Sequence, residues 1–161
     1  MSFRTADLCD EYEGKQPLQI AEPILRVFGG HSVFKGTIST VKVFEDNVLI
    51  RSALEEEGKN RVLVVDGGGS HRCALIGSDL ARLAADNHWA GIIVYGCIRD
   101  SVALEKLPIG IRALHTHPLK SHKRGTGDRD VLITFAGINF KTGHNLYADE
   151  DGIVVCESPL E

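Results

Sequence analysis

The adjacent pair Arg99-Asp100 combines the two side-chain types in this chain best suited to chemistry on a small acid. Arginine offers a planar set of donors that matches a carboxylate, and it stays charged at any working pH. Aspartate offers a hard oxygen suited to Mg²⁺, which takes one or two protein carboxylates and keeps several waters. The pair therefore predicts a site for an anionic ligand and a divalent cation. A structural interpretation is also open, in which Asp100 caps a short helix, Ser101–Leu107, and Arg99 forms a nearby salt bridge.

A glycine run, Gly67–Gly69, lies between Asp66 and Ser70. It lacks the G-x-G-x-x-G spacing of a dinucleotide-binding turn, and no predicted helix opens directly from it. Two interpretations stand for this run. It is either a tight turn or bulge, or a place where the backbone approaches a small ligand closely.

Other reactive side chains favour structural interpretations. His115 and His117 share one face of a predicted strand near His122, but no cysteine or acid in the immediate sequence completes a Zn²⁺ site, so solvated or interface histidines are favoured. Cys97 lies near Arg99, which could lower the pKa of its thiol, but no histidine shares the loop, so a buried, inert thiol is favoured. A basic loop is expected to be solvated or to contact another subunit, and it contains Lys120, His122, Lys123 and Arg124.

The elements around Arg99-Asp100 predict a βαβ unit. Arg61–Asp66 is uniformly apolar and β-branched, as buried parallel strands are, and Gly91–Gly96 has the same character. Between them, Asp79–Trp89 has helical periodicity, with Ser78 as a possible cap. In an open α/β sheet, ligands bind beyond the carboxyl ends of the strands, where the first N–H groups of a helix also attract anions. The βαβ unit therefore predicts a pocket that includes Arg99-Asp100 and the start of the helix.

The rest of the chain indicates a single α/β or α+β domain with a mixed sheet. A helix is expected over Ala6–Tyr12 with Thr5 as its cap, and a second runs from the Asn47 cap to Gly58. A strand is expected over Gly36–Phe44. Short strands dominate the last third, over Ile111–His117, Val131–Phe135, Ile138–Phe140 and Gly152–Val155.

Composition narrows the class of protein. The chain has 161 residues, of which 43% are hydrophobic and 25% charged, and these values are typical of one globular domain. Its net charge of −4 argues against a nucleic-acid binder that works by bulk charge. The apolar runs are too short for a membrane span. The first residues lack the apolar stretch of a secretory signal, and the four cysteines are widely separated, so a cytoplasmic protein with reduced thiols is expected.

Several stretches of the chain resemble the RraA-like family. The similarity is strongest in V-L-V-V-D-G-G-G-S-H-R-C-A-L-I-G, from residue 62, and in L-A-R-L-A-A-D-N-H-W-A-G-I-I-V-Y-G-C-I-R-D, from residue 80. Shorter matches are L-C-D, F-G-G, V-K-V-F-E-D-N and L-Y-A-D-E-D-G-I-V-V, so the resemblance spans residues 1–161 as one domain. The family includes regulators of ribonuclease E activity and metal-dependent aldolases for 4-hydroxy-4-methyl-2-oxoglutarate.

The resemblance implies a swivelling β/β/α-type domain that assembles as a homotrimer, sometimes paired into a hexamer, with sites at subunit boundaries. It implies that Gly77, Ser78, Asp79 and Leu80 contact the substrate, that Arg99 binds it, and that Asp100 holds Mg²⁺ or Mn²⁺. Aldolase members carry a carboxylate that positions a water, with twenty residues between it and the Arg-Asp pair. Here that place is Ser78, and Asp79 comes one residue later, which is about 100° of turn on a helix.

Two functions are therefore expected as alternatives. The first is a lyase that cleaves 4-hydroxy-4-methyl-2-oxoglutarate to two pyruvates and decarboxylates oxaloacetate, with Arg99 and Asp100 as its catalytic residues. The second is a non-catalytic protein that binds and inhibits ribonuclease E. Asp100 discriminates between them, because an inhibitor has no need of a metal ligand.

Overall fold

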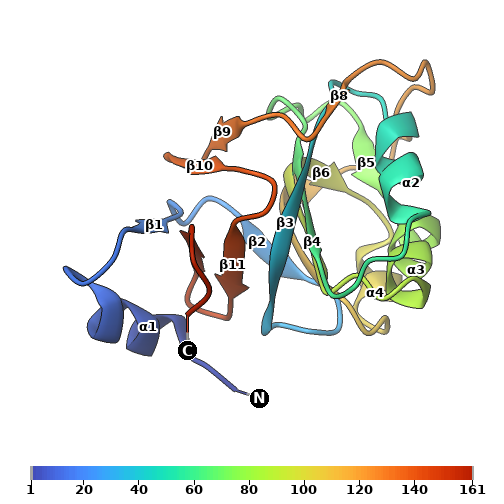
Figure 1. Cartoon of the computed structure of the whole chain (residues 1–161). Coiled ribbons are helices and arrows are strands. Elements are labelled where there is room, and N and C mark those ends of the chain that lie inside the picture. Colours follow the sequence, from blue (N-terminus) through green and yellow to red (C-terminus); the bar gives the residue numbers. More distant parts are fainter. Residues whose placement is uncertain (1, 161) are drawn as a thin grey trace.

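The apolar run in the middle of the sequence forms β4 (Val62–Asp66), which lies near the centre of a curled, mixed sheet (Figure 1). β4 pairs in parallel with β3 (Phe34–Lys42) on one side and with β6 (Gly91–Ile98) on the other. Its four apolar side chains, residues 62–65, are fully buried and point alternately into two hydrophobic clusters on opposite faces of the sheet. Burial on both faces explains why this strand is uniformly apolar, and it confirms the predicted parallel strand.

The computed structural model describes residues 2–160. The strand order in the main sheet is β1-β12-β11-β3-β4-β6-β7-β2, in which β3, β4, β6 and β7 (Gly110–Thr116) are parallel and the flanking strands are antiparallel. The flanking strands are β1 (Leu18–Ile20), β2 (Arg26–Phe28), β11 (Asn145–Ala148) and β12 (Ile153–Cys156). β5 (Ala74–Ile76) adds to β6, and β8 (Asp128–Arg129) adds to β3. β9 (Ile133–Phe135) and β10 (Ile138–Phe140) form a separate hairpin.

The sheet is covered on both faces. Helices α2 (Val48–Leu54), α3 (Ser78–Asp86) and α4 (Ser101–Leu104) cover one face, and the β9–β10 hairpin packs with β11 and β12 against the other (Figure 1). Burying each large apolar side chain in these clusters contributes about 1.5–3 kcal/mol relative to exposure. The arrangement confirms a mixed α/β fold. No helix within residues 2–160 is both long and apolar enough to cross a membrane.

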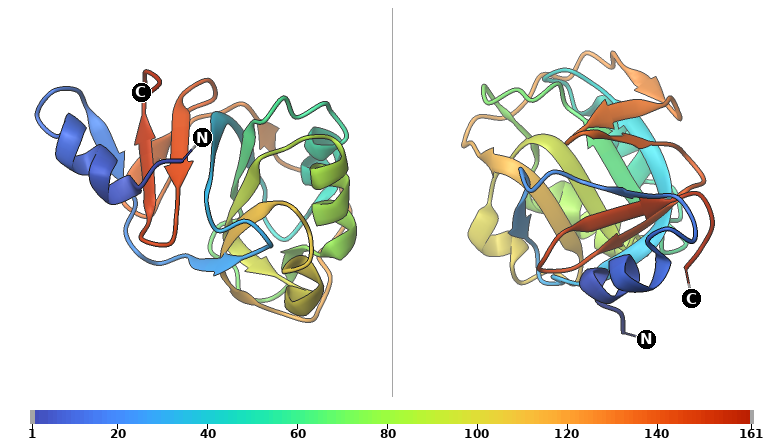
Figure 2. Two further views of the ribbon diagram at one scale, coloured as in Figure 1. Left: turned by 90° about the horizontal axis from the view of Figure 1, so that it is seen from below. Right: turned by 90° about the vertical axis from the view of Figure 1, so that its left-hand side faces the viewer.

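Two ends of the chain pack together. Helix α1 (Thr5–Tyr12) lies against the C-terminal hairpin, where Leu8 packs with Tyr147, Cys156 and Leu160 (Figure 2). The predicted role of Thr5 as a helix cap is wrong, because Thr5 is the first helical residue. Its hydroxyl instead donates to the buried Asp149 carboxylate at 2.6 Å, because that carboxylate needs donors to offset its burial.

The other predicted helix ends agree only in part. Asn47 is the N-cap residue of α2, as predicted, but its side chain bonds Leu75 and Lys123 and makes no capping bond. Asp46 Oδ1 accepts the Val48 N–H at 3.0 Å. Helix α2 ends at Leu54, four residues before Gly58, so Gly58 does not terminate it. Ser78 is inside α3 and does not cap it. The helix expected over residues 101–107 is limited to α4, which has a single turn.

Candidate active site

The six residues expected to bind substrate or metal line one cleft of about 100 Å³. β5 ends immediately before Gly77 and β6 ends immediately before Arg99. These two strands are parallel neighbours, so their carboxyl ends meet at the same edge of the sheet. The sequence had suggested β4 and β6 as the strands that flank the pocket, but β5 takes the place of β4 at this edge. The residues brought together are Gly77, Ser78, Asp79, Leu80, Arg99 and Asp100.

Asp100 has a left-handed backbone, with φ 60° and ψ 38°, which places its carboxylate over the start of α3. Asn and Asp adopt this conformation more readily than most residues. Asp100 Oδ2 accepts the Ser78 N–H at 2.9 Å, and this bond, together with the Ser78 side chain and the Arg99 charge, holds the carboxyl pKa below its usual value. Asp100 occupies the N-cap position of α4, as the structural interpretation expected, but its side chain makes no capping bond to that helix.

Arg99 is half-buried, and its Nη1 donates to the Pro118 carbonyl at 3.3 Å. The close packing at Gly77 holds this side chain beside Asp100. A Cβ at residue 77 would lie 2.9 Å from Asp100 Oδ2 and 3.3 Å from Arg99 Cγ, so only glycine leaves room for both. The expected salt bridge of Arg99 with a nearby acid is not among the ion pairs of residues 2–160.

Ser78 and Asp79 occupy the first turn of α3 and have different surroundings. The Ser78 N–H is bonded to Asp100, whereas the next two N–H groups, of Asp79 and Leu80, have no partner within the helix. The Asp79 carboxylate is 88% exposed and pairs with Arg82 at 3.8 Å. Asp79 thus lines the cleft, but its carboxylate lies toward solvent and Arg82. This agrees with the rotation of about 100° that separates Asp79 from Ser78 on the helix.

Seven further residues line the cleft that sequence reasoning did not assign to it: the apolar Ala74 and Leu75 of β5, and the polar Asn47, Arg51, Lys120, Ser121 and Lys123. Bridges between Ala74 and Lys120 and between Asp46 and His122 bring two distant segments to the edge of the sheet. The basic character of residues 120–124 was a visible signal. It was assigned to solvation or subunit contact because nothing in the local sequence shows that these residues cross over the cleft.

The cleft carries more positive than negative side chains. Arg51, Lys120 and Lys123 join Arg99, against the carboxylates of Asp79 and Asp100. Lys123 Nζ lies 3.3 Å from Asn47 Oδ1, and Asn47 Nδ2 donates to the Leu75 carbonyl at 3.1 Å, so one amide links the basic loop to β5. This balance of charge suits a small ligand with more than one acidic group.

The other candidates lie outside the cleft. Gly68 and Gly69 have positive φ and form a tight turn, as one of the two interpretations of the glycine run expected. A Cβ at residue 68 would meet the Phe44 ring, and a Cβ at residue 69 would meet the Tyr95 ring. Cys97 is fully buried, and burial raises the pKa of its thiol. The histidines do not form a metal cage, since residues 2–160 contain no group of three or more His, Cys, Asp or Glu placed to hold an ion.

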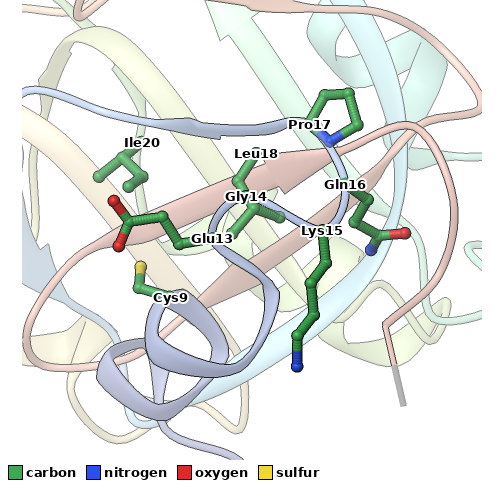
Figure 3. A pocket seen from close by; sticks show the side chains of 8 residues that line it. All are labelled: Cys9, Glu13, Gly14, Lys15, Gln16, Pro17, Leu18 and Ile20. Atoms are coloured by element: carbon green, nitrogen blue, oxygen red, sulfur yellow. The ribbon is translucent and has the colours of Figure 1, made fainter.

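A larger hollow, about 650 Å³, lies between α1 and β1 at the opposite end of the molecule (Figure 3). The Cys9 thiol and the Glu13 carboxylate face the same space, while Lys15 points away from them. Burial and the nearby Asp10 and Glu13 charges raise the pKa of the Cys9 thiol, so it is a poor nucleophile. The smaller cleft at β5 and β6, with its opposed charges and open helix start, is therefore the candidate active site.

The sequence profile of the RraA-like family, described as Aldolase/RraA, matches residues 5–155. A protein of Methylococcus capsulatus, provisionally named a 4-hydroxy-4-methyl-2-oxoglutarate aldolase, is 69% identical over 99% of both chains. The structure of the RNA-processing inhibitor RraA from Thermus thermophilus superimposes with a TM-score of 0.95 at 44% identity, covering 100% of this chain and 96% of that one. A Geobacillus kaustophilus structure, described as S-adenosylmethionine:2-dimethylmenaquinone methyltransferase, has a TM-score of 0.94 at 48% identity, covering 98% and 97%.

These matches define the class of protein to which the fold and the cleft correspond. The chain belongs to the RraA-like family, as its sequence stretches had indicated.

Proposed function

We propose that this protein is a divalent-metal-dependent lyase that cleaves 4-hydroxy-4-methyl-2-oxoglutarate to two pyruvates and also decarboxylates oxaloacetate. The observation that carries the proposal is the placement of Arg99 and Asp100 at the start of α3, in a cleft with a surplus of positive charge. The names of highly identical relatives support the cleavage reaction. Decarboxylation is proposed because both reactions pass through the same pyruvate enolate.

The residues of the cleft have separable roles in this proposal. In the cleavage, the carbon–carbon bond beside the substrate hydroxyl breaks, that hydroxyl loses its proton, and the electron pair moves onto the 2-oxo group. Arg99 binds substrate oxygens on which this charge develops, and the unpaired N–H groups of Asp79 and Leu80 bind a substrate carboxylate. The enolate carbon then takes up a proton, for which a water near Asp79 is the proposed carrier.

The donors of the cleft fit a hard, weakly held cation. Asp100 contributes one exposed carboxylate, and it remains ionised because its pKa is lowered. A single protein carboxylate with waters is typical of Mg²⁺ or Mn²⁺ and does not suit Zn²⁺. Such an ion, when bound, supplies Lewis-acid stabilisation of the charge on the 2-oxo group.

Pyruvate release with and without a chelator tests the proposed function. We expect turnover of both substrates with Mg²⁺ or Mn²⁺, its complete loss in EDTA, and its recovery when the metal is restored. Because the core contains no metal ligand cluster within residues 2–160, the melting temperature should stay the same in EDTA. Absence of metal-dependent turnover on either substrate would contradict the lyase proposal, whereas a large fall in melting temperature would show that the metal is structural.

We further propose that the protein assembles as a homotrimer or as a pair of trimers. The family resemblance supports this, as do large apolar side chains that are more than half exposed in one chain, including Ile20, Val102 and Leu132. Light scattering should return three or six times the chain mass of 17.6 kDa. A 17.6 kDa particle at micromolar concentration would contradict the assembly.

Inhibition of a ribonuclease E-type enzyme is the second candidate function. The structural similarity to the RNA-processing inhibitor from Thermus thermophilus favours it. The two functions are separable, because inhibition through the outer surface should survive loss of Asp100 or Arg99, and lyase activity should not. A protein that inhibits the ribonuclease and releases no pyruvate would favour the regulator.

A further inference from the structure

The basic loop, residues 119–126, covers one side of the cleft without forming a helix or strand of its own. It places the Lys120 and Lys123 side chains at the cleft, and both residues are exposed. A loop this exposed is normally mobile unless its backbone is tied down. The two lysine charges therefore stay at the cleft only if bonds to the loop backbone hold the loop in place.

Backbone bonds at Leu119 and His122 hold the first half of this loop, and the Asp46 side chain holds its second half, residues 124–126. Only 2% of the Asp46 surface is exposed, and its Oδ2 accepts three consecutive backbone N–H groups, those of Arg124, Gly125 and Thr126, at 2.8, 2.9 and 3.3 Å. Its Oδ1 accepts the Val48 N–H at 3.0 Å, so the same carboxylate also holds the start of α2. Successive N–H groups that converge in this way form a nest that fits an anion, and here the chain supplies its own.

The bonding pattern depends on the negative charge of Asp46. Burial disfavours the charged form, but the four backbone N–H groups outweigh burial and lower the pKa of this carboxyl. Three backbone N–H groups and the Thr126 hydroxyl share one carboxylate oxygen, and Val48 donates to the other. The amide of an asparagine would therefore point its own N–H groups at N–H donors on one side. Asparagine therefore has the right size and the wrong polarity for this position.

We propose that Asp46 is a positioning residue for the candidate active site, and that its carboxylate fixes the basic loop so that Lys123 stays at the cleft and binds the anionic substrate. Asp46 and Lys123 are connected through few residues. Lys123 is adjacent to Arg124, the first residue that Asp46 holds, and its ammonium reaches Asn47 on the other wall of the cleft. This inference rests on the proposed lyase function.

A matched control lies at the other end of the molecule. Asp149 is equally buried, at 1% exposure, and accepts the Thr5 N–H and hydroxyl together with the N–H groups of Asp151 and Gly152. Asp149 lines no part of the cleft. Replacing either aspartate by asparagine therefore weakens a similar set of bonds, but only the change at residue 46 releases residues 124–126 of the basic loop.

The test compares Asp46→Asn with Asp149→Asn by steady-state kinetics on oxaloacetate with Mg²⁺ and by limited trypsin digestion of the folded proteins. For Asp46→Asn we expect KM to rise about 10-fold while kcat changes by less than about 3-fold, because substrate binding is lost and the metal ligand stays in place. Trypsin should cut after Lys123 or Arg124 at least about 10-fold faster than in the parent. Asp149→Asn should lower the melting temperature comparably without either effect.

Two further variants keep the proposal open to contradiction if Asp46→Asn does not fold. Gly125→Ala strains the backbone of the anchored turn, because Gly125 has φ +82°, and KM should therefore rise. The added Cβ would meet only Val48, at 3.8 Å, so there is no clash and the melting temperature should change little. Lys123→Ala should raise KM without increasing cleavage after Arg124. Combined with Asp46→Asn it should add little, since both changes remove the same contact.

An unchanged KM in both Asp46→Asn and Gly125→Ala would overturn the proposal, as would an equal rise in KM in Asp149→Asn. If the parent protein has no turnover, the lyase function fails by itself. The trypsin result then still decides whether Asp46 holds the loop, and unaltered cleavage after Lys123 and Arg124 would overturn that part too.

Discussion

Asp100→Asn should reduce turnover on both 2-oxo acids by at least about 100-fold, because the proposed divalent cation at this position would contribute several kcal/mol to stabilising the enolate charge. The substitution is conservative for the fold. Asparagine tolerates the left-handed backbone of residue 100, and its carbonyl oxygen can still accept the Ser78 N–H. The melting temperature should therefore shift by less than about 4 °C.

Direct metal binding separates this outcome from a general loss of function. Mn²⁺ titration followed by electron paramagnetic resonance should show a site in the parent that is absent or much weaker in Asp100→Asn. Asp86→Asn is the matched control, because Asp86 is exposed at the far end of α3 and loses the same charge. Full turnover in Asp100→Asn would contradict the metal-site assignment and leave the rest of the cleft in place.

Arg99→Ala should lower kcat/KM by about 100-fold or more, because in the proposed mechanism the guanidinium contacts oxygens that gain charge in the transition state. Arg99→Lys should recover only part of this loss. A lysine ammonium keeps the charge but cannot present two parallel donors to a carboxylate, and it lacks the reach that lets Nη1 donate to the Pro118 carbonyl.

The test compares kcat and KM of the Arg99 variants with those of a control variant at another arginine. Arg26→Ala removes a charge from an exposed position on β2, at the far edge of the sheet, and should leave kcat/KM unchanged. If Arg99→Ala raised KM alone, with kcat intact, Arg99 would bind the ground state and the transition state equally. If neither parameter changed, the assignment of Arg99 to the substrate would be wrong.

The parts of the fold that were predictable from the sequence are those in which the order of apolar and polar residues reflects directly which faces are buried. β4 is apolar at every position and buried on both faces, and β6 shares that environment, so both strands were located together with the helix between them. Strands of two to four residues carry little periodicity, so they were found only in part. The short strands β9, β10 and β12 were expected, whereas β1, β2, β5, β8 and β11 were missed.

Prediction of the cleft was partial for a related reason. Gly77–Leu80 and Arg99-Asp100 follow neighbouring strands, so their meeting could be inferred from strand ends and from the family resemblance. Asn47 and the lysines of the basic loop reach the cleft only through the bridge between Asp46 and His122 and through the buried Asp46 carboxylate. Bonds between residues almost eighty positions apart leave no local trace in a single sequence.

The pairing of the two chain ends constrains when this protein can finish folding. Within residues 2–160, β1 pairs in the main sheet with β12 alone, and Thr5 finds its acceptor in Asp149, 144 residues later. The edge strand β1 therefore stays unpaired until β12 is in place, and this contact joins segments that are far apart in the sequence. A folding chain of this protein accordingly presents an open strand edge for longer than a chain whose fold is built from local contacts.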